Sequence, residues 1–241
     1  MENLYLFILL ALLAEIAGTV GGFGSSLFFV PIASYFLDFH SVLGITALFH
    51  VSSNLSKIAF FRKGVNVMLI IYLGIPAVLF VLAGAWLTQF IATKTLEIVL
   101  SIFLIAISLV FLYFNNIFIQ PSKLNAITGG TLSGFIAGLV GTGGAIRALV
   151  FSAFQLKTEV FIATSAVVDL AIDASRSFVY WHNGFVHAHD LYLIPILLLV
   201  SIAGTFIGKK ILQYISESLF KKIVLFLILL TGVFTLFKLL Y

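Results

Sequence analysis

Ten apolar runs, separated by short polar or glycine-rich breaks, dominate this sequence and restrict the chain to one class of fold. Inside a lipid bilayer every backbone polar group must be paired within the protein, so runs of this kind are predicted to be helices. Hydrophobic residues make up 62% of the chain and charged residues 9%, a composition that no water-soluble domain of this size can bury. The sequence therefore predicts an all-α polytopic membrane protein. The runs cover roughly residues 3–17, 24–37, 41–61, 66–92, 96–115, 124–140, 143–156, 158–181, 189–213 and 219–240.

The composition also argues against several classes of function. The chain contains no cysteine, which rules out disulfides and thiolate metal sites. Its net charge of +4 is spread over the loops without a basic run, so nucleic-acid binding gains no support. The stretch GFGSS (22–26) resembles the Gly-x-Ser of a serine protease only loosely, and no histidine partner for it can be named. We therefore expect neither an enzyme nor a bound cofactor.

The second half of the chain resembles the first at an offset of about 120 residues. The stretch ALFHVSSNLSK (47–57) aligns with AVVDLAIDASR (166–176) in the same order along the chain. A common order and a near-constant offset indicate a duplicated unit, so we predict two repeats, residues 1–120 and 121–241, within one integrated membrane domain. The other matches place Gly18, Val20, Gly21, Gly24 and Val30 on Gly138, Val140, Gly141, Gly144 and Val150, and AGAW (83–86) on AGTF (203–206).

The glycine-rich stretches interrupt the start of each repeat. Runs 3–17 and 24–37 are each short for a hydrocarbon core about 30 Å thick, so together they form either one overlong crossing or a hairpin that enters and leaves on one side. Hairpins give each repeat an odd number of crossings, which inverts the second repeat relative to the first. That arrangement gathers Arg62, Lys63, Lys123, Lys157, Lys209, Lys210, Lys221 and Lys222 on one face and leaves Lys94 and Lys238 on the other. The positive-inside rule favours it, which predicts inverted repeats, each a hairpin plus three transmembrane helices, with both termini outside the cytoplasm.

The hairpins create a candidate anion site. The second helix of each hairpin starts at the glycines, so its free N–H groups and positive dipole end point into the protein, where they favour an anion. Inversion brings the two starts together near the middle of the membrane. Arg147 adds a guanidinium in the first turn, unless it forms a structural ion pair with Glu15, and the hydroxyls could equally act as helix caps. The predicted substrate-binding residues are Gly21, Gly22, Gly24, Ser25, Ser26, Gly141, Thr142, Gly143, Gly144 and Arg147.

Ionisable residues recur on one face of a predicted helix in each repeat. His50, Asn54 and Lys57 are spaced i, i+4 and i+7, and the second repeat has charged residues at equivalent positions. Ionisable groups inside a membrane are candidates for function, and histidine titrates near physiological pH. The face either couples transport to a proton or forms a polar seam in which the aspartates pair with Arg176 or Lys57, and Lys57 could also snorkel to the interface. The residues assigned to this coupling role or seam are Glu15, His50, Asn54, Lys57, Asp169, Asp173 and Arg176.

Two further motifs receive structural interpretations. The stretch HAHD (187–190) places two histidines and an acid in an outer loop, but a motif this short is weak, and we predict no metal site. The glycines of AGAW (83–86) and around Gly204 indicate close packing between helices.

Glycine motifs open both repeats, as GTVGGFGSSLFFVP (18–31) and GLVGTGGAIRALVF (138–151). A small polar helix then leads to a basic glycine turn in SSNLSKIAFFRKG (52–64), with DASRSFVYWHNG (173–184) as its counterpart. In these motifs the chain resembles the TauE/SafE family of sulfite and organosulfonate exporters, also known as DUF81, over almost its whole length. The resemblance implies transport of small sulfur-containing anions and does not identify the anion.

These expectations combine into a secondary transporter of a small sulfur-containing anion, such as sulfite, a sulfonate or a related oxyanion, bound between two glycine-loop helix starts. No nucleotide-binding motif is visible, so an ion or substrate gradient would drive it. Two alternatives stay open, a cation transporter that uses the buried acids and a membrane scaffold that transports nothing. The expected partners are the anionic substrate, the lipid bilayer and, in a homo-oligomer, further copies of the chain, but no nucleic acid. The expected location is the cell membrane, with several passes.

Overall fold

Helices account for the architecture, as the apolar runs predict. The computed structural model describes residues 3–22, 24–62, 64–113, 119–214 and 217–240, which leaves Lys63 outside the described residues, and no β-strand occurs within these ranges. Among the residues that the structure describes, four helices are long and apolar enough to cross a membrane: α1 (Leu4–Gly21), the continuous run Val67–Phe90, α6 (Thr93–Tyr113) and α10 (Leu193–Ile211). The other main helices are α2 (Ser26–Ala33), α3 (Phe39–Phe60), α7 (Lys123–Val140), α8 (Gly144–Ala153), α9 (Thr158–His182) and α11 (Glu217–Leu240).

The first glycine-rich break is shorter than the sequence predicts. Gly18 and Gly21 lie inside α1, and the chain leaves the helix only at Gly22, whose φ of 71° is left-handed. With 18 residues, α1 is about 27 Å long, not the short segment expected to end near residue 17. The prediction of a break was right, but its position was too early, because two of the four glycines are tolerated within a packed helix.

Two predicted helices are also interrupted. The run expected at 66–92 consists of α4 (Val67–Leu69), one π-helical turn η1 (Ile70–Gly74), α5 (Ile75–Leu87) and the 3-10 turn η2 (Thr88–Phe90). The wide turn directly precedes Pro76, which has no N–H to donate into a regular helix. The helix expected from residue 189 begins only with α10, after the 3-10 turn η3 (Ala188–Asp190).

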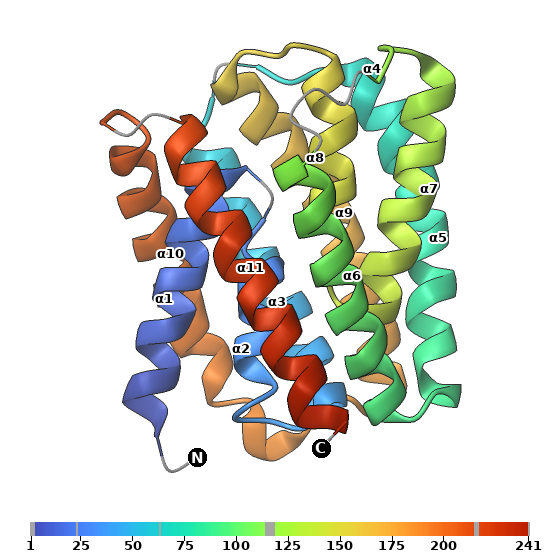
Figure 1. Ribbon diagram of the computed structural model, residues 1–241, viewed down its shortest axis with the longest axis vertical. Helices are drawn as coiled ribbons and strands as arrows, with labels where there is room; N and C mark the ends of the chain where they lie inside the picture. The colour runs from blue at the N-terminus through green and yellow to red at the C-terminus, as the bar shows by residue number, and fades with distance from the viewer. Residues whose placement is uncertain (1–2, 23, 63, 114–118, 215–216, 241) are drawn as a thin grey trace.

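Helices that are distant in sequence pack together in a repeated pattern. α1 packs against α10 and α7 against α5, while α3 packs against α9 and α6 against α11. Figure 1 shows both chain ends at the lower end of the molecule and the starts of α7, α9 and α11 at the upper end. The upper end therefore carries Lys123, Lys157, Lys221 and Lys222 in or beside these helix starts, and the lower end carries Lys94 and Lys238.

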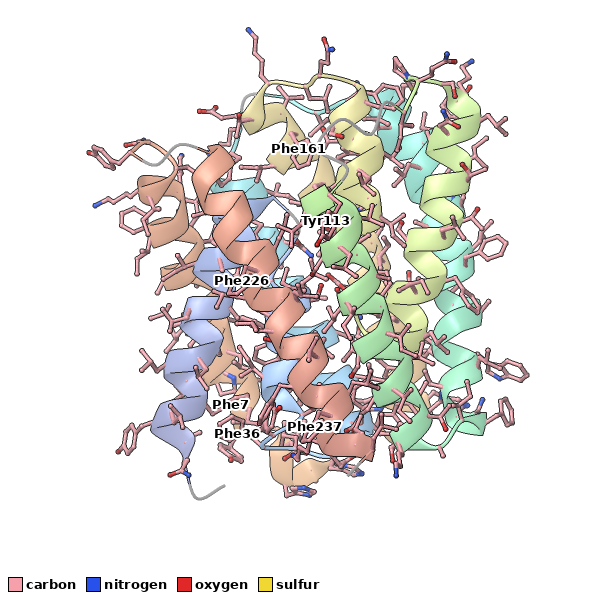
Figure 2. The ribbon with its side chains drawn as sticks, in the orientation of Figure 1. Phe7, Phe36, Tyr113, Phe161, Phe226 and Phe237 are labelled. Carbon is pink, nitrogen blue, oxygen red and sulfur yellow. The ribbon has the colours of Figure 1, made fainter. Side chains whose placement is uncertain are left out.

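Aromatic rings hold α2 against α1. The ring of Phe7 in α1 lies edge-on to Phe29 in α2, with centroids 5.8 Å apart, and to Phe36 beyond α2, at 5.3 Å. Figure 2 shows Phe7 and Phe36 beside each other near the lower end. Edge-to-face pairs of this kind stabilise a contact beyond simple burial, so the short α2 is fixed as the returning arm of a hairpin.

Glycines allow α5 and α7 to approach until their backbones touch. A Cβ atom on Gly134 or Gly138 of α7 would collide with the backbone of α5, one on Gly130 with the backbone of η1, and one on Gly84 of α5 with the backbone of α7. Small residues at such spacing are typical of tightly packed helices in membranes. The prediction of close packing at AGAW is therefore confirmed at Gly84.

We expect the substitution Gly134→Ala to destabilise the protein. The added methyl group would meet backbone atoms of Ala77, which cannot rotate away, and overpacking of this kind costs about 1–3 kcal/mol. That cost exceeds the gain of about 1 kcal/mol that alanine brings to a helix. Thermal unfolding of the purified protein measures the effect. Thr128→Ala, at an exposed position of the same helix, is the control, and equal unfolding temperatures for the two variants would contradict the packing argument.

Candidate functional site

The turns of the two hairpins are built on glycine. α1 ends at Gly22 (φ 71°) and α7 ends at Gly141 (φ 81°), both in the left-handed region that glycine adopts without steric cost. Gly18 and Gly143 have a second role, because a Cβ on either would collide with backbone atoms of the facing segment. The glycine motifs therefore supply both the turn and the close approach of the chain to itself.

The two hairpin turns touch each other. The hydroxyl of Ser26, the first residue of α2, lies 3.0 Å from the hydroxyl of Thr142, just before α8. Both side chains are buried. Neither α2 nor α8 has its first N–H groups capped by the side chain of the preceding residue. Two positive helix ends thus converge inside the protein, 116 residues apart in sequence.

Glu15 is the best-satisfied charged group of the site. Its carboxylate is fully buried and pairs with the ammonium group of Lys57 at 2.9 Å. Four hydroxyl groups complete its coordination, one from α1 itself and three from other parts of the fold. Ser25 and Ser53 donate to it at 2.6 Å each, Thr205 at 3.0 Å and Thr19 at 3.3 Å. Lys57 is itself buried, so the alternative in which it snorkels to the interface is wrong.

The alternative in which Arg147 forms a structural ion pair with Glu15 is also wrong. Arg147 instead forms an ion pair with Asp169 of α9, although Asp169 was expected to pair with Arg176 or Lys57. One guanidinium nitrogen, Nε of Arg147, is buried without any hydrogen-bond partner. The Arg147 side chain thus has an ion-pair partner but keeps one N–H group, at Nε, free to bind an acceptor.

A chain of polar contacts crosses the interface between α3 and α9. Asn54 donates to Oδ2 of Asp173 at 2.7 Å, and Arg176 holds Oδ1 of the same carboxylate at 2.8 and 2.9 Å. Arg176 also donates to the carbonyl oxygen of Ala137 at the end of α7. The pairing of Asp173 with Arg176 was one of the predicted pairings and is confirmed.

His50 lies between the first hairpin and this seam. Its Nε2 is 3.1 Å from Oγ of Ser25, and its Nδ1 is 4.0 Å from Oδ2 of Asp173. Because Ser25 donates its single proton to Glu15, Nε2 must donate to Ser25, which assigns the tautomer by inference. A neutral His50 then directs the lone pair of Nδ1 toward a carboxylate. The ring is therefore placed to take up a proton at Nδ1.

A small cavity joins these groups. It has room for about 20 Å³, enough for one or two water molecules. Glycines of both hairpins line it, together with the two serines of the first hairpin, His50 and all three basic side chains, whereas Thr142 does not line it. If all groups are ionised, the three acids balance the three bases and the site is neutral. The lining includes Gly24, Ser25, Ser26, Ser53, Asn54, Lys57, Gly141, Gly143, Gly144, Arg147, Asp169, Asp173 and Arg176.

A larger cavity of about 230 Å³ lies on one side of the site and contains Gly21 and Gly22. A narrow passage beside Gly22 and Phe161 shares residues with both cavities. A Cβ on Gly22 would lie 3.3 Å from the ring of Phe161, and Figure 2 places Phe161 toward the upper end of the molecule. The larger cavity, which we call the vestibule, therefore leads from the basic end toward the small cavity, with Phe161 between them.

The sequence singled out most, but not all, of the groups gathered here. Gly21 and Gly22 line the vestibule instead of the small cavity, and Glu15 stands behind Ser25 without lining either. Sequence reasoning missed Ser53 and Thr205, both of which donate to Glu15. Ser53 shares a helix face with His50 and Lys57 and could have been found by that spacing, whereas nothing in the sequence points to Thr205.

Comparison with known proteins decides the family. The family described as "Sulfite exporter TauE/SafE" matches residues 7–235 of the chain. The chain belongs to the TauE/SafE sulfite exporter family. The protein named "Probable membrane transporter protein MJ0441", from Methanocaldococcus jannaschii, is 29% identical to this TauE/SafE protein, over 98% of this chain and 95% of the relative. No solved structure matches the chain significantly. The expectation of a multi-pass membrane transporter is confirmed at the level of the family.

We expect the ion pair of Glu15 and Lys57 to be essential to the folding of this TauE/SafE protein. Lys57→Met would leave a buried carboxylate without a cation, which costs about 3–5 kcal/mol. The double variant Glu15→Gln/Lys57→Met removes both charges and should recover part of that loss. Thermal unfolding of the single and double variants measures the coupling. A double variant that loses the sum of the two single effects would contradict the direct pairing.

Proposed function

We propose that the chain is a secondary transporter that binds a small sulfur-containing oxyanion, of the sulfite or sulfonate class, between the starts of α2 and α8. The observation that carries this proposal is the meeting of two uncapped helix starts at Ser26 and Thr142, beside the unpartnered Nε of Arg147. Family membership supports the substrate class. The cavity is too small for the anion, so this structure corresponds to a closed state, and the cavity must widen before the anion binds.

Each oxygen of such an anion would find a donor. Amide groups at the start of α8 and Nε of Arg147 provide N–H groups, and charge-assisted hydrogen bonds of this type are among the strongest in proteins. The hydroxyls of Ser26 and Thr142, now bonded to each other, can rotate toward the anion. A planar guanidinium suits an oxyanion better than a lysine ammonium group does.

The balance of charge in the site argues for a coupled proton. Three acids and three bases already neutralise one another, so an anion alone would bring an uncompensated charge into a buried site, at a cost of several kcal/mol. We infer that a proton on Nδ1 of His50 accompanies the anion and is stabilised by Asp173. The proposed seam thus serves both as interhelical contact and as the coupling element.

We also propose the inverted duplication and the orientation in the membrane. In support, Gly84 of α5 lies against Phe135, and Gly204 of α10 lies against Glu15. The two contacts are equivalent under the offset of 120 residues, which relates Gly84 to Gly204 and Glu15 to Phe135. The basic residues at the upper end favour a cytoplasmic location for that end, which leaves the N-terminus and C-terminus outside (Figure 1). The repeats would then be residues 1–120 and 121–241, with alternating access about the shared site.

The two alternative functions receive less support. A transported cation would need a free carboxylate, but Glu15, Asp169 and Asp173 each have a basic partner. A scaffold without transport would bury its glycine turns against bulky side chains, whereas these turns border two cavities.

Flux through proteoliposomes tests the anion site. Replacing Arg147 alone would leave the carboxylate of Asp169 without its basic partner. The informative variant is therefore Arg147→Gln/Asp169→Asn, which removes the guanidinium and keeps the site neutral. We expect radiolabelled sulfite or sulfonate flux to fall about tenfold or more, since a hydrogen bond to a charged group contributes about 1.5–3 kcal/mol. Lys94→Gln, at the start of α6 on the lower end, is the control for loss of a basic side chain outside the site and should transport normally.

The two possible failures of this experiment differ. Wild-type vesicles without sulfite or sulfonate flux above that of empty vesicles would refute the substrate class. Wild-type flux that is unchanged in the double variant would refute the site and leave the substrate class in place.

The vestibule predicts access from the cytoplasm in this state, and a chain without cysteine allows a direct test. Ala148 lines the vestibule and Thr93 is exposed at the opposite end. A membrane-impermeant maleimide should label Ala148→Cys in inside-out membranes and Thr93→Cys in right-side-out membranes. Labelling of Ala148→Cys only in right-side-out membranes would reverse the proposed orientation.

A further inference from the structure

The HAHD motif forms a compact group of metal-binding atoms at the lower end, far from the cavity described above. His187, His189 and Asp190 each offer one ligand atom, and these atoms all lie within 4.8 Å of one another. Nδ1 of His187 is 3.8 Å from Oδ2 of Asp190, and Nε2 of His189 is 3.5 Å from Oδ1. Ligands of tetrahedral Zn²⁺, bound at about 2.0–2.2 Å, lie about 3.4 Å from one another. Small rotations of the two rings would therefore satisfy a shared ion.

One oxygen of the Asp190 carboxylate, Oδ2, lacks a hydrogen-bond partner. Its side chain is only 4% exposed, and Oδ2 is buried without a hydrogen bond. A buried charged oxygen that is left unpaired is costly, and such groups in proteins are normally paired or bound to metal. The unsatisfied atom faces Nδ1 of His187, so the missing partner belongs in the space between them.

A single shared cation fits this group better than protonation of both histidines. The rings of His187 and His189 are stacked, with centroids 5.3 Å apart and planes 11° from parallel. Two adjacent imidazolium ions would repel each other. One divalent ion can instead be coordinated by both neutral rings and by the carboxylate.

Asp38 is placed to act as a fourth ligand from another part of the chain. It precedes α3, and its Oδ2 lies 3.9 Å from Nδ1 of His187. Oδ1 of Asp38 accepts from the backbone N–H of Ser41, which leaves Oδ2 for coordination. The hydroxyl of Ser41 is now 2.7 Å from Nδ1 of His187, and metal binding would replace that hydrogen bond.

Packing against α3 holds the loop that carries these ligands in place. Gly44 permits the backbone of Phe185 and the side chain of Val186 to approach, since a Cβ there would collide with both. The ring of Phe185 stacks on His40 with centroids 4.0 Å apart. A loop fixed in this way loses little freedom when it binds an ion.

We propose that His187, His189 and Asp190, with Asp38 as a fourth ligand, bind one Zn²⁺ or a similar divalent ion that prefers imidazole. The ion ties the connection between α2 and α3 to the loop before α10. Without cysteine in the chain, only nitrogen and oxygen ligands are available. The proposal does not rest on the nature of the transported substrate.

Metal titration of the full-length protein tests this site. The protein is purified with a tag that contains no histidine, stripped with EDTA and titrated with Zn²⁺ in a calorimeter. We expect one equivalent to bind, and His189→Ala and Asp190→Asn each to weaken binding about tenfold or more. Asp38→Asn should have a smaller effect, because its side chain is 56% exposed. His182→Ala, at an exposed position outside the cluster, is the matched control and should bind like the wild type.

A spectroscopic measurement identifies the ligands. With Cu²⁺ as the probe, electron paramagnetic resonance should show coupling to two imidazole nitrogens in the wild type and to one in His189→Ala. Absence of stoichiometric binding in the wild type, or equal binding in the wild type and His189→Ala, would overturn the proposal. The His189 side chain is 76% exposed, so its removal does not threaten the fold even where Asp190→Asn does.

Discussion

No charge or backbone amide deep in a bilayer can rely on water, and this constraint shapes the whole structure. Each acid that borders the central site has a basic partner, and every one of those pairs joins different parts of the fold or is tied to another helix by a further hydrogen bond. Glu15 shows the extent of the requirement, since a lysine and hydroxyls from α1, α2, α3 and α10 all converge on it. The polar contacts thereby fix which helices pack together.

The same constraint explains how much the sequence could predict. Apolar runs must become helices in lipid, so the helices and the two broken hairpins follow from hydropathy and glycine alone. The face shared by His50, Asn54 and Lys57 follows from helical spacing. The partner of Arg147 did not follow, because spacing within one helix says nothing about the rotation of its neighbours. The sequence offered only Glu15 as an acidic partner for Arg147, and only the packing of α8 against α9 shows that Asp169 pairs with it.

Local propensity failed in two instructive places. Gly18 and Gly21 were assigned to a loop, yet both lie within α1, where contacts with α10 and with the returning chain outweigh their poor helix propensity. The π-helical turn before Pro76 also escaped prediction, because the apolar pattern of that run continues without interruption through it. Tertiary packing sets the geometry at the two glycines, whereas the missing N–H of Pro76 accounts for the wide turn.

The exchange of neighbours between the two parts of the chain has a mechanical consequence. α1 rests on α10 and α7 rests on α5, so the first hairpin packs on a helix that is synthesised near the end of the chain, and the second on a helix that is synthesised before it. A fragment that ends near residue 120 would contain the first hairpin but not α10, the helix against which α1 packs. The hydrogen bond from Thr205 to Glu15 can therefore form only after α10 has been synthesised and inserted. Completion of the fold is thus a late event that follows membrane insertion.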